Sequence, residues 1–299
     1  MMNKIIIITG LTASGKSGLA IDIARKYNGE IISADSVQVY RQLNIGSAKE
    51  SIETMNEIPH HLIDIKDFDK TYNVGEFIVD CENAIKDIIS RGKLPIIVGG
   101  TGMYIKALME GYSLGESSAN LEFREYYQNL AKSQGNEAVW NELNTLNPNL
   151  ASKVHFNNLK RVIRYLEIEK FGNTLENNTE SILKDYDLYA VGIVADREMI
   201  YDMINKRVDI MISDGLEQEV KYLVENGANR NTQSTNSIGY REWFDYFEGL
   251  QDRDNTINLI KQHTRNYCKR QLTFLKTIKN IKILDKSTAK DEIVKFLEG

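Results

Sequence analysis

Cysteine, proline and long apolar runs are all scarce in this chain of 299 residues. Its two cysteines, Cys81 and Cys268, lie far apart and lack the spacing of a zinc site. No apolar run approaches the roughly eighteen residues that a membrane span needs, so we expect no membrane segment. The apolar start, Lys4 to Thr9, is too short for a signal peptide and is typical of a buried first strand. With no export signal and few thiols, we expect a cytoplasmic protein.

The composition is that of a globular protein, with 42% hydrophobic and 26% charged residues and only 3 prolines. A net charge of −5 and a pI near 5.6 argue against nucleic acid as a partner. The acidic residues are unevenly distributed, however. The stretch from Asn255 to Leu284 contains seven Lys or Arg and no Asp or Glu, and Ala151 to Arg164 is acid-free as well. A locally basic surface is therefore open to the chain.

The first hundred residues alternate strand and helix signals, which predicts a parallel sheet with helices on both faces. Strands are expected at Lys4 to Thr9, Glu30 to Ser33, His60 to Ile65 and Leu94 to Val98, and helices at Lys16 to Arg25 and Val74 to Ser90.

Only helical patterns follow Gly111 until a strand signal returns at Leu188 to Val194. We therefore expect a helical insertion over residues 114–184, set into a core formed by residues 1–113 and 185–299. Helices at Glu198 to Asp214, Leu216 to Asn226 and Ile257 to Lys276, a strand at Lys282 to Leu284 and a terminal helix complete the core. The predicted fold class is α/β, with a P-loop NTPase-like core, a mainly parallel sheet and an all-helical insertion domain.

The segment between the first strand and the first helix fits the P-loop pattern G-x-x-x-x-G-K-[ST]. Glycines let such a loop curl until its amides point at phosphate oxygens, and the helix N-terminus adds a positive dipole end. Lys16 supplies a full charge, and the Ser17 hydroxyl is a ligand for Mg²⁺. The predicted diphosphate site consists of Gly10, Leu11, Thr12, Ala13, Ser14, Gly15, Lys16 and Ser17.

A P-loop alone does not name its ligand. The D-x-x-G and N-K-x-D signatures of GTPases are absent, whereas a P-loop kinase of a nucleotide or small metabolite stays open as an alternative, as does a non-catalytic RNA-binding protein. Asp35 follows the second predicted strand, where a carboxylate would face a bound ligand or would cap a turn. Gly99 to Gly102 allows close backbone approach to a ligand, or forms a tight turn that begins a helix.

Near the C-terminus, Lys261, Arg265 and Lys269 recur every four residues beside an apolar stripe, with Arg270 adjacent. We call these four residues the basic ridge. It is either a solvated lysine face or a surface that follows a phosphate backbone, and the absence of interleaved acids favours the second interpretation.

Taken together, the motifs resemble those of the tRNA dimethylallyltransferase (tRNA isopentenyltransferase) family over nearly the whole chain. The P-loop matches G-P-T-A-S-G-K-[ST] with Leu11 in place of proline, and Asn158 stands where N-D-x-x-R-x-x-R has aspartate. Six further matches are Asp35 to Tyr40 with D-S-x-Q-x-Y, Ile45 to Lys49 with I-G-[ST]-A-K, Pro59 to Leu62 with P-H-H-L, Gly99 to Tyr104 with G-G-T-G-[LM]-Y, Ile238 to Glu242 with I-G-Y-[KR]-E and Thr264 to Gln271 with T-R-x-Y-x-K-R-Q.

The resemblance implies transfer of a dimethylallyl group from dimethylallyl diphosphate to the exocyclic amine of adenosine 37, beside the anticodon of tRNA. It implies Asp35 as general base, Thr101 beside the adenine amine, and Lys16, Arg207 and Mg²⁺ on the diphosphate, with Ser17 as metal ligand. The P-loop makes this a nucleotide-binding or ATP-binding type of fold. We expect a monomer.

The resemblance also implies contacts with the anticodon stem-loop, partly from the helical insertion. The residues expected there are Asp35, Ser36, Val37, Gln38, Thr101, Arg124, Lys160, Arg161, Val162, Ile163, Arg164, Ile238, Gly239, Tyr240, Arg241, Arg265, Lys269 and Arg270.

Overall fold

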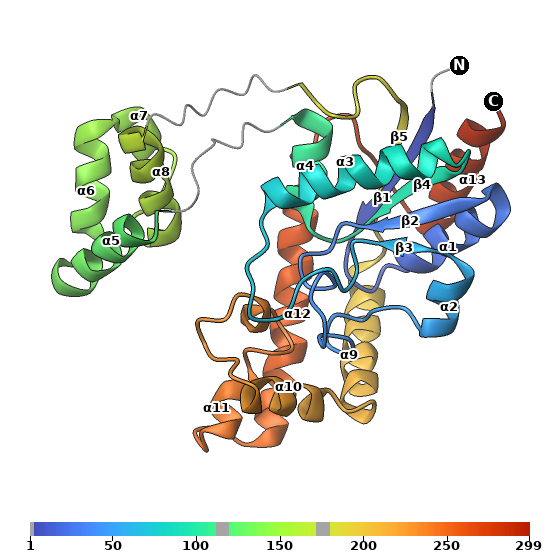
Figure 1. The fold of residues 1–299 in the computed structure, drawn as a ribbon. Coiled ribbons are helices and arrows are strands. Elements are labelled where there is room, and N and C mark those ends of the chain that lie inside the picture. Colours follow the sequence, from blue (N-terminus) through green and yellow to red (C-terminus); the bar gives the residue numbers. More distant parts are fainter. Residues whose placement is uncertain (1–2, 112–119, 172–179) are drawn as a thin grey trace. The chain divides into compact units, whose positions relative to one another are not determined.

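The computed structural model describes residues 3–111, 120–171 and 180–299 (Figure 1). The chain divides into two compact units, one of Met1–Glu110 with Ser181–Gly299 and one of Gly111–Glu180. The boundaries expected from the sequence lie a few residues from these.

A parallel sheet forms the centre of the first unit. Its strand order among the described residues is β3-β2-β4-β1-β5-β6, and every neighbouring pair is parallel. The strands are β1 (Lys4–Gly10), β2 (Gly29–Ser33), β3 (His60–His61), β4 (Leu94–Val98), β5 (Asp187–Ile193) and β6 (Lys282–Leu284). Strand β1 lies between β4 and β5, which explains its unbroken isoleucines, because both of its faces are buried. The predicted parallel α/β core is confirmed.

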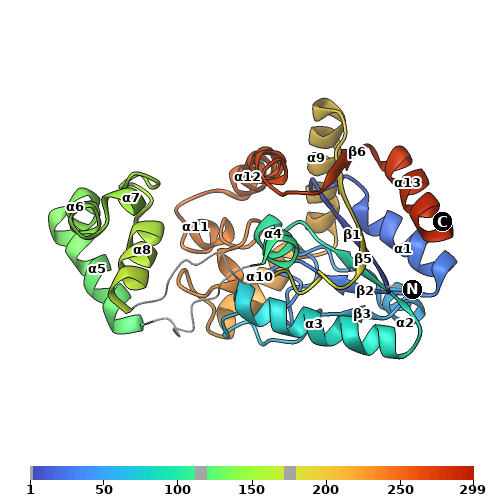
Figure 2. The same cartoon turned by 90° about the horizontal axis from the view of Figure 1, so that it is seen from above.

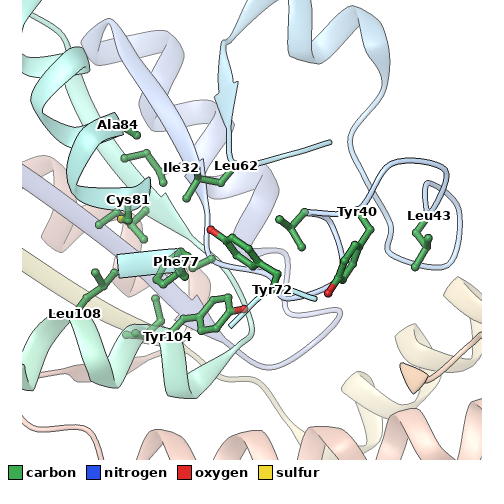
Figure 3. Close-up of a cluster of buried hydrophobic side chains, with 14 of the residues drawn as sticks. Ile32, Tyr40, Leu43, Leu62, Tyr72, Phe77, Cys81, Ala84, Tyr104 and Leu108 are labelled. Carbon is green, nitrogen blue, oxygen red and sulfur yellow. The ribbon is translucent and has the colours of Figure 1, made fainter. Parts of the chain in front are cut away.

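Successive isoleucines of β1 point to opposite faces of the sheet. Ile6 and Ile8 pack with α1 (Lys16–Tyr27) and α13 (Lys286–Glu298). Ile5 and Ile7 pack with α3 (Val74–Ser90) and α4 (Gly102–Glu110), and Figure 2 shows these helix pairs on opposite sides of the sheet. On the second face Phe77 of α3 stacks on Tyr104 of α4, with ring centroids 4.2 Å apart (Figure 3).

The remaining described elements of this unit are three long helices that the sequence predicted and three short helical segments that it did not. They are α2 (Ile52–Glu57), α9 (Arg197–Ser213), α10 (Leu216–Glu225), a 3₁₀ turn at Ser234–Asn236, α11 (Trp243–Phe247) and α12 (Arg253–Leu275). The expected third strand, His60 to Ile65, is wrong in length: it stops after His61 because Leu62 and Asp64 have φ of 62° and 56°, outside the extended region. Helix α12 begins earlier than expected because the Asp252 side chain caps it, accepting from the Asn255 N–H.

The second unit is entirely helical over its described residues. It contains α5 (Leu121–Gln134), α6 (Asn136–Leu146), α7 (Pro148–Ala151) and α8 (Leu159–Phe171). Val139, Leu143, Val162 and Leu166 are fully buried in a core that belongs to this unit. Across the part of the chain that the structure describes, no helix is both long and apolar enough to span a membrane.

Candidate active site

The P-loop is shaped by backbone conformations that only glycine adopts readily. Gly10 has φ of 131°, and a Cβ there would lie 2.2 Å from the Ile193 carbonyl oxygen. Gly15, at φ of 78°, ends the loop at the first turn of α1. Leu11 and Ala13 turn inward and pack against Ile200 and Ile204 of α9. Leu11, which stands where the family pattern has proline, therefore anchors the loop, and its side chain is not a phosphate contact.

A pocket of about 380 Å³ opens over the P-loop. It brings together thirteen of the predicted site residues from separate segments, namely Thr12, Lys16, Ser17, Asp35, Ser36, Val37, Gln38, Thr101, Arg207, Ile238, Gly239, Arg241 and Arg270. The carboxyl ends of β1, β2 and β4 carry the first three of these segments, as expected for ligand sites of open parallel sheets.

Lys16 and Arg207 place two cations at this pocket. Burial is the main cause that lowers the pKa of Lys16 to about 8, and the charge of Arg207 adds to it, while Asp35 opposes the shift. Burial also lowers the pKa of Arg207. Two partly desolvated cations favour an anion of high charge density at the pocket, such as a diphosphate.

Asp35 both caps a turn and faces the pocket. Its Oδ1 accepts from the Val37 N–H at 2.8 Å and from the Gln38 N–H at 3.4 Å. Within the described residues Oδ2 accepts no hydrogen bond, so this oxygen is available to a ligand. The turn cap is therefore confirmed, and contact of Asp35 with a ligand stays a prediction that its place at the pocket allows.

Thr101 is held against the same turn. Its Oγ1 accepts from the Ser36 N–H at 3.0 Å and donates to the Ser36 Oγ at 3.3 Å. The loops can approach this closely because Gly99 has no side chain: a Cβ there would lie 2.1 Å from the Ala34 carbonyl oxygen. Helix α4 begins directly after Thr101, so the glycine segment is also a turn that begins a helix.

Two residues that the sequence analysis did not assign hold these loops together from α12. Gln271 accepts from the Thr12 N–H at 2.8 Å and donates to the Gly100 carbonyl at 3.0 Å, and the Tyr267 hydroxyl donates to that carbonyl at 3.2 Å. Both lie within the T-R-x-Y-x-K-R-Q match, where only the cations were given a role. One P-loop amide that was expected to face phosphate is thus occupied by Gln271.

The four cations of the basic ridge differ in their partners and in their exposure, although they follow a regular spacing in the sequence. Lys261 forms an ion pair with Asp209 of α9 at 2.6 Å, and the Arg265 guanidinium donates to the Asn205 side chain at 2.6 Å. The acid that the ridge itself lacks is thus supplied to Lys261 by a neighbouring helix. Lys269 and Arg270 are exposed, and Arg270 lies over the Tyr267 ring at the pocket.

Several residues expected to contact tRNA have buried side chains. Val162 and Ile163 belong to the core of the insertion, and Tyr240 is fully buried in the first unit. Direct contact of these three side chains with RNA is excluded as long as the units stay folded. At these positions of the two motifs the side chains pack in the core of their own unit.

The arginines of the insertion have structural partners as well. Glu167 is fully buried, and Arg124 and Arg164 each pair with its Oε2 at 2.7 Å. Burial alone would raise the pKa of Glu167, but the two guanidiniums hold it below its ordinary value. Lys160 and Arg161 are exposed, and Arg161 donates to the Tyr165 hydroxyl at 2.9 Å.

The donor set of the pocket fits a Mg²⁺ ion that arrives with a ligand. In residues 3–111, 120–171 and 180–299 no group of three or more His, Cys, Asp and Glu could hold a metal by itself. Mg²⁺ on phosphate substrates usually keeps several waters and takes few protein ligands. Ser17, in the first turn of α1 and at the pocket, offers one such hydroxyl.

The fold and the pocket define a P-loop α/β protein in which two partly desolvated cations, Lys16 and Arg207, lie at one pocket. The family model described as IPP transferase matches residues 38–278, so the chain belongs to this family. It is 42% identical to the tRNA dimethylallyltransferase of Bacillus cytotoxicus, over 99% of this chain and 95% of that protein.

Solved structures of such transferases are similar to this chain as well. The tRNA delta(2)-isopentenylpyrophosphate transferase of Staphylococcus epidermidis is similar with a TM-score of 0.72 at 39% identity, covering 99% of both chains. A eukaryotic dimethylallyltransferase acting on tRNA gives a TM-score of 0.78 at 31% identity, over 95% of this chain and 74% of that one. The matches that cover 99% of this chain include the P-loop, which lies before the residues that the family model matches.

Proposed function

We propose that this protein transfers the dimethylallyl group of dimethylallyl diphosphate to the exocyclic amine of adenosine 37 in tRNA. The observation that carries the proposal is the pocket itself, which joins the cations of the P-loop side to Asp35 and Thr101. The family and its named relatives favour this function over a P-loop kinase.

In the proposed reaction, the adenine nitrogen attacks the first carbon of the prenyl group as the bond from that carbon to the diphosphate oxygen breaks. The P-loop amides, Lys16 and Arg207 stabilise the charge that builds on the departing diphosphate. Bound Mg²⁺, with Ser17 as protein ligand, would neutralise part of the same charge. Asp35 takes the proton that the nitrogen loses, and Thr101, fixed by Ser36, holds the amine in place.

The adenine must leave its stack to enter such a pocket, which costs least in a single-stranded loop. Exposed cations on each unit support binding of the anticodon stem-loop: Lys160 and Arg161 in the insertion, Lys269 and Arg270 on α12. A cytoplasmic monomer stays a prediction.

The test measures transfer of a labelled prenyl group from the donor to RNA. The protein is incubated with Mg²⁺, dimethylallyl diphosphate labelled in the prenyl group, and unmodified tRNA with adenosine at position 37. We expect label on the RNA, and none on a matched tRNA with guanosine there. Label that stays on the donor, together with phosphoryl transfer from ATP to a nucleotide or metabolite, would favour the kinase. Binding of tRNA without either reaction would indicate a non-catalytic RNA-binding protein.

A further inference from the structure

Glu219, on α10, lies outside the motifs but accepts an unusual set of hydrogen bonds from residues within and beside them. Its Oε2 accepts from the backbone N–H groups of Asn44 and Ile45, both at 2.8 Å. Its Oε1 accepts from the Gly46 N–H at 3.1 Å and from the Tyr240 hydroxyl at 2.7 Å. Three successive amides around one anion form the kind of concave site in which proteins bind phosphate, and here the protein's own carboxylate fills it.

These bonds join two segments of the pocket wall. Gly46, Ser47 and Ala48 of one segment line the pocket, as do Ile238, Gly239 and Arg241 of the other. Tyr240 packs against the loop so closely that a Cβ on Gly46 would lie 2.5 Å from its ring. Burial raises the pKa of Tyr240 well above 10, so its hydroxyl stays protonated and donates to Glu219. Glu219 itself is not among the described residues that line the pocket.

The loop held by Glu219 is connected in turn to Asp35. The Gln38 side-chain amide donates to the carbonyls of Ser47 and Ala48, each at 3.2 Å. The Gln38 side-chain oxygen accepts from the Ser33 hydroxyl at 2.8 Å. Gln38 belongs to the turn that Asp35 caps, because its N–H donates to the Asp35 Oδ1 as that of Val37 does, so its position fixes part of that turn. Glu219 is thus connected to Asp35 in steps: the Gly46 N–H donates to Glu219, the neighbouring Ser47 carbonyl accepts from the Gln38 side chain, and the Gln38 N–H donates to Asp35.

We propose that Glu219 is a positioning residue: by fixing the loop of residues 44–48 against Tyr240, it places Gln38 and the Asp35 turn for the adenosine. This inference rests on the proposed function and assigns Glu219 to its acceptor side. The P-loop is held separately, by β1, α9 and Gln271. The donor site should therefore not depend on Glu219.

The main test is Glu219→Gln, which keeps the size but replaces one acceptor oxygen by a donor that faces N–H and O–H groups. Loss of hydrogen bonds to a charged group predicts a single-turnover rate, at saturating tRNA, about 10- to 100-fold below wild type. The Kd for dimethylallyl diphosphate should stay within about twofold. Tyr240→Phe removes one donor and should lower the same rate by about three- to tenfold. Glu217→Gln, on the same helix and paired with Arg253, is the matched control and should react normally.

Amide hydrogen exchange gives a second measurement that does not require activity. The N–H groups of Asn44, Ile45 and Gly46 should exchange faster in Glu219→Gln, while that of Leu19 in α1, bonded to the Gly15 carbonyl, should not change.

A wild-type rate in Glu219→Gln, or a donor affinity that falls as much as the rate, overturns the proposal. If wild-type protein labels no tRNA, the proposed function fails. If the three amides then exchange in Glu219→Gln as in the wild type, the role of Glu219 in fixing the loop of residues 44–48 is rejected as well. Faster exchange would support that role.

Discussion

The side-chain oxygen of Gln271 accepts a hydrogen bond from the Thr12 N–H at 2.8 Å, and so joins α12 directly to the P-loop. The amide group of the same side chain donates to the Gly100 carbonyl at 3.0 Å. A residue 259 positions away from Thr12 thus fixes the spacing between the P-loop and the Gly99–Gly102 turn. In the proposed reaction, this spacing sets the distance between the donor and acceptor sides of the pocket.

Replacing Gln271 by Met should weaken donor binding, because the near-isosteric side chain makes neither hydrogen bond. Loss of two bonds predicts a Kd for dimethylallyl diphosphate about tenfold higher. The measurement is calorimetric titration, with Gln262→Met, exposed on the same helix, as control. Unchanged or tighter binding would mean that Gln271 leaves Thr12 when the diphosphate binds.

The second prediction concerns Asp35. Asp35→Asn retains an oxygen that can cap the turn to Val37 but cannot take the proton, so the fold should persist while the chemical step fails. General-base loss predicts a single-turnover rate about 10² to 10⁴ lower at saturating tRNA, with tRNA binding little changed. Asp69→Asn, on the exposed surface, is the control. A wild-type rate in Asp35→Asn would leave Asp35 as a turn cap only.

The pKa of Lys16, lowered to about 8, predicts a pH dependence of donor use. Only the protonated amine attracts diphosphate, so kcat/KM for the donor should fall as the pH rises through about 8. Because burial and Arg207 lower this pKa, Arg207→Met should move the fall to higher pH, although activity is lower throughout. Initial rates between pH 6.5 and 9.5 provide the check.

The lowered pKa of Lys16 affects stability in the opposite direction: the free energy of unfolding should rise over a pH range in which donor use falls. Between about pH 8 and 10.5 the unfolded chain holds a proton on Lys16 that the folded chain lacks. This group therefore makes the free energy of unfolding rise with pH in that window. In Lys16→Met that contribution should be missing, as denaturant titrations at several pH values would reveal.

Within the basic ridge, the structure predicts different roles for two lysines. Lys269 is exposed, whereas Lys261 is paired with Asp209. Lys269→Ala should weaken tRNA binding and flatten its dependence on log salt by roughly one unit per lost phosphate contact. Lys261→Ala, the matched comparison, should change the salt dependence much less. Equal slopes for both variants would refute this distinction.

The last prediction concerns Arg124 of the insertion, which was expected to contact tRNA but is paired with Glu167. Arg124→Ala removes one of two guanidiniums from the buried Glu167 and should destabilise this unit by about 1–3 kcal/mol. The loss should shrink as the pH falls below about 4, where Glu167 is protonated in the unfolded chain and its lowered pKa no longer stabilises the fold. Thermal unfolding of Arg124→Ala and of Lys160→Ala, which should keep the wild-type Tm, tests this.

Local patterns in the sequence determine much of this protein. Continuous apolar runs predicted β1 and β4 correctly, and the helical period of apolar residues predicted α3, because burial sorts the side chains of these elements. The P-loop followed from glycines at fixed spacing and from the strand and helix beside them. The resemblance of the motifs to one family was also readable, since each motif is a short continuous segment.

Only the tertiary structure decided which residues meet. Gln271 contacts Thr12, and Glu219 contacts residues 44–46 and Tyr240, across separations that no local pattern encodes. It also decided the state of the charges: Asp209 of α9 neutralises Lys261, and Arg124 and Arg164 are bound to Glu167. Interactions between charges and hydrogen-bonding groups depend on distance and on exclusion of water, and both are set by how the elements pack.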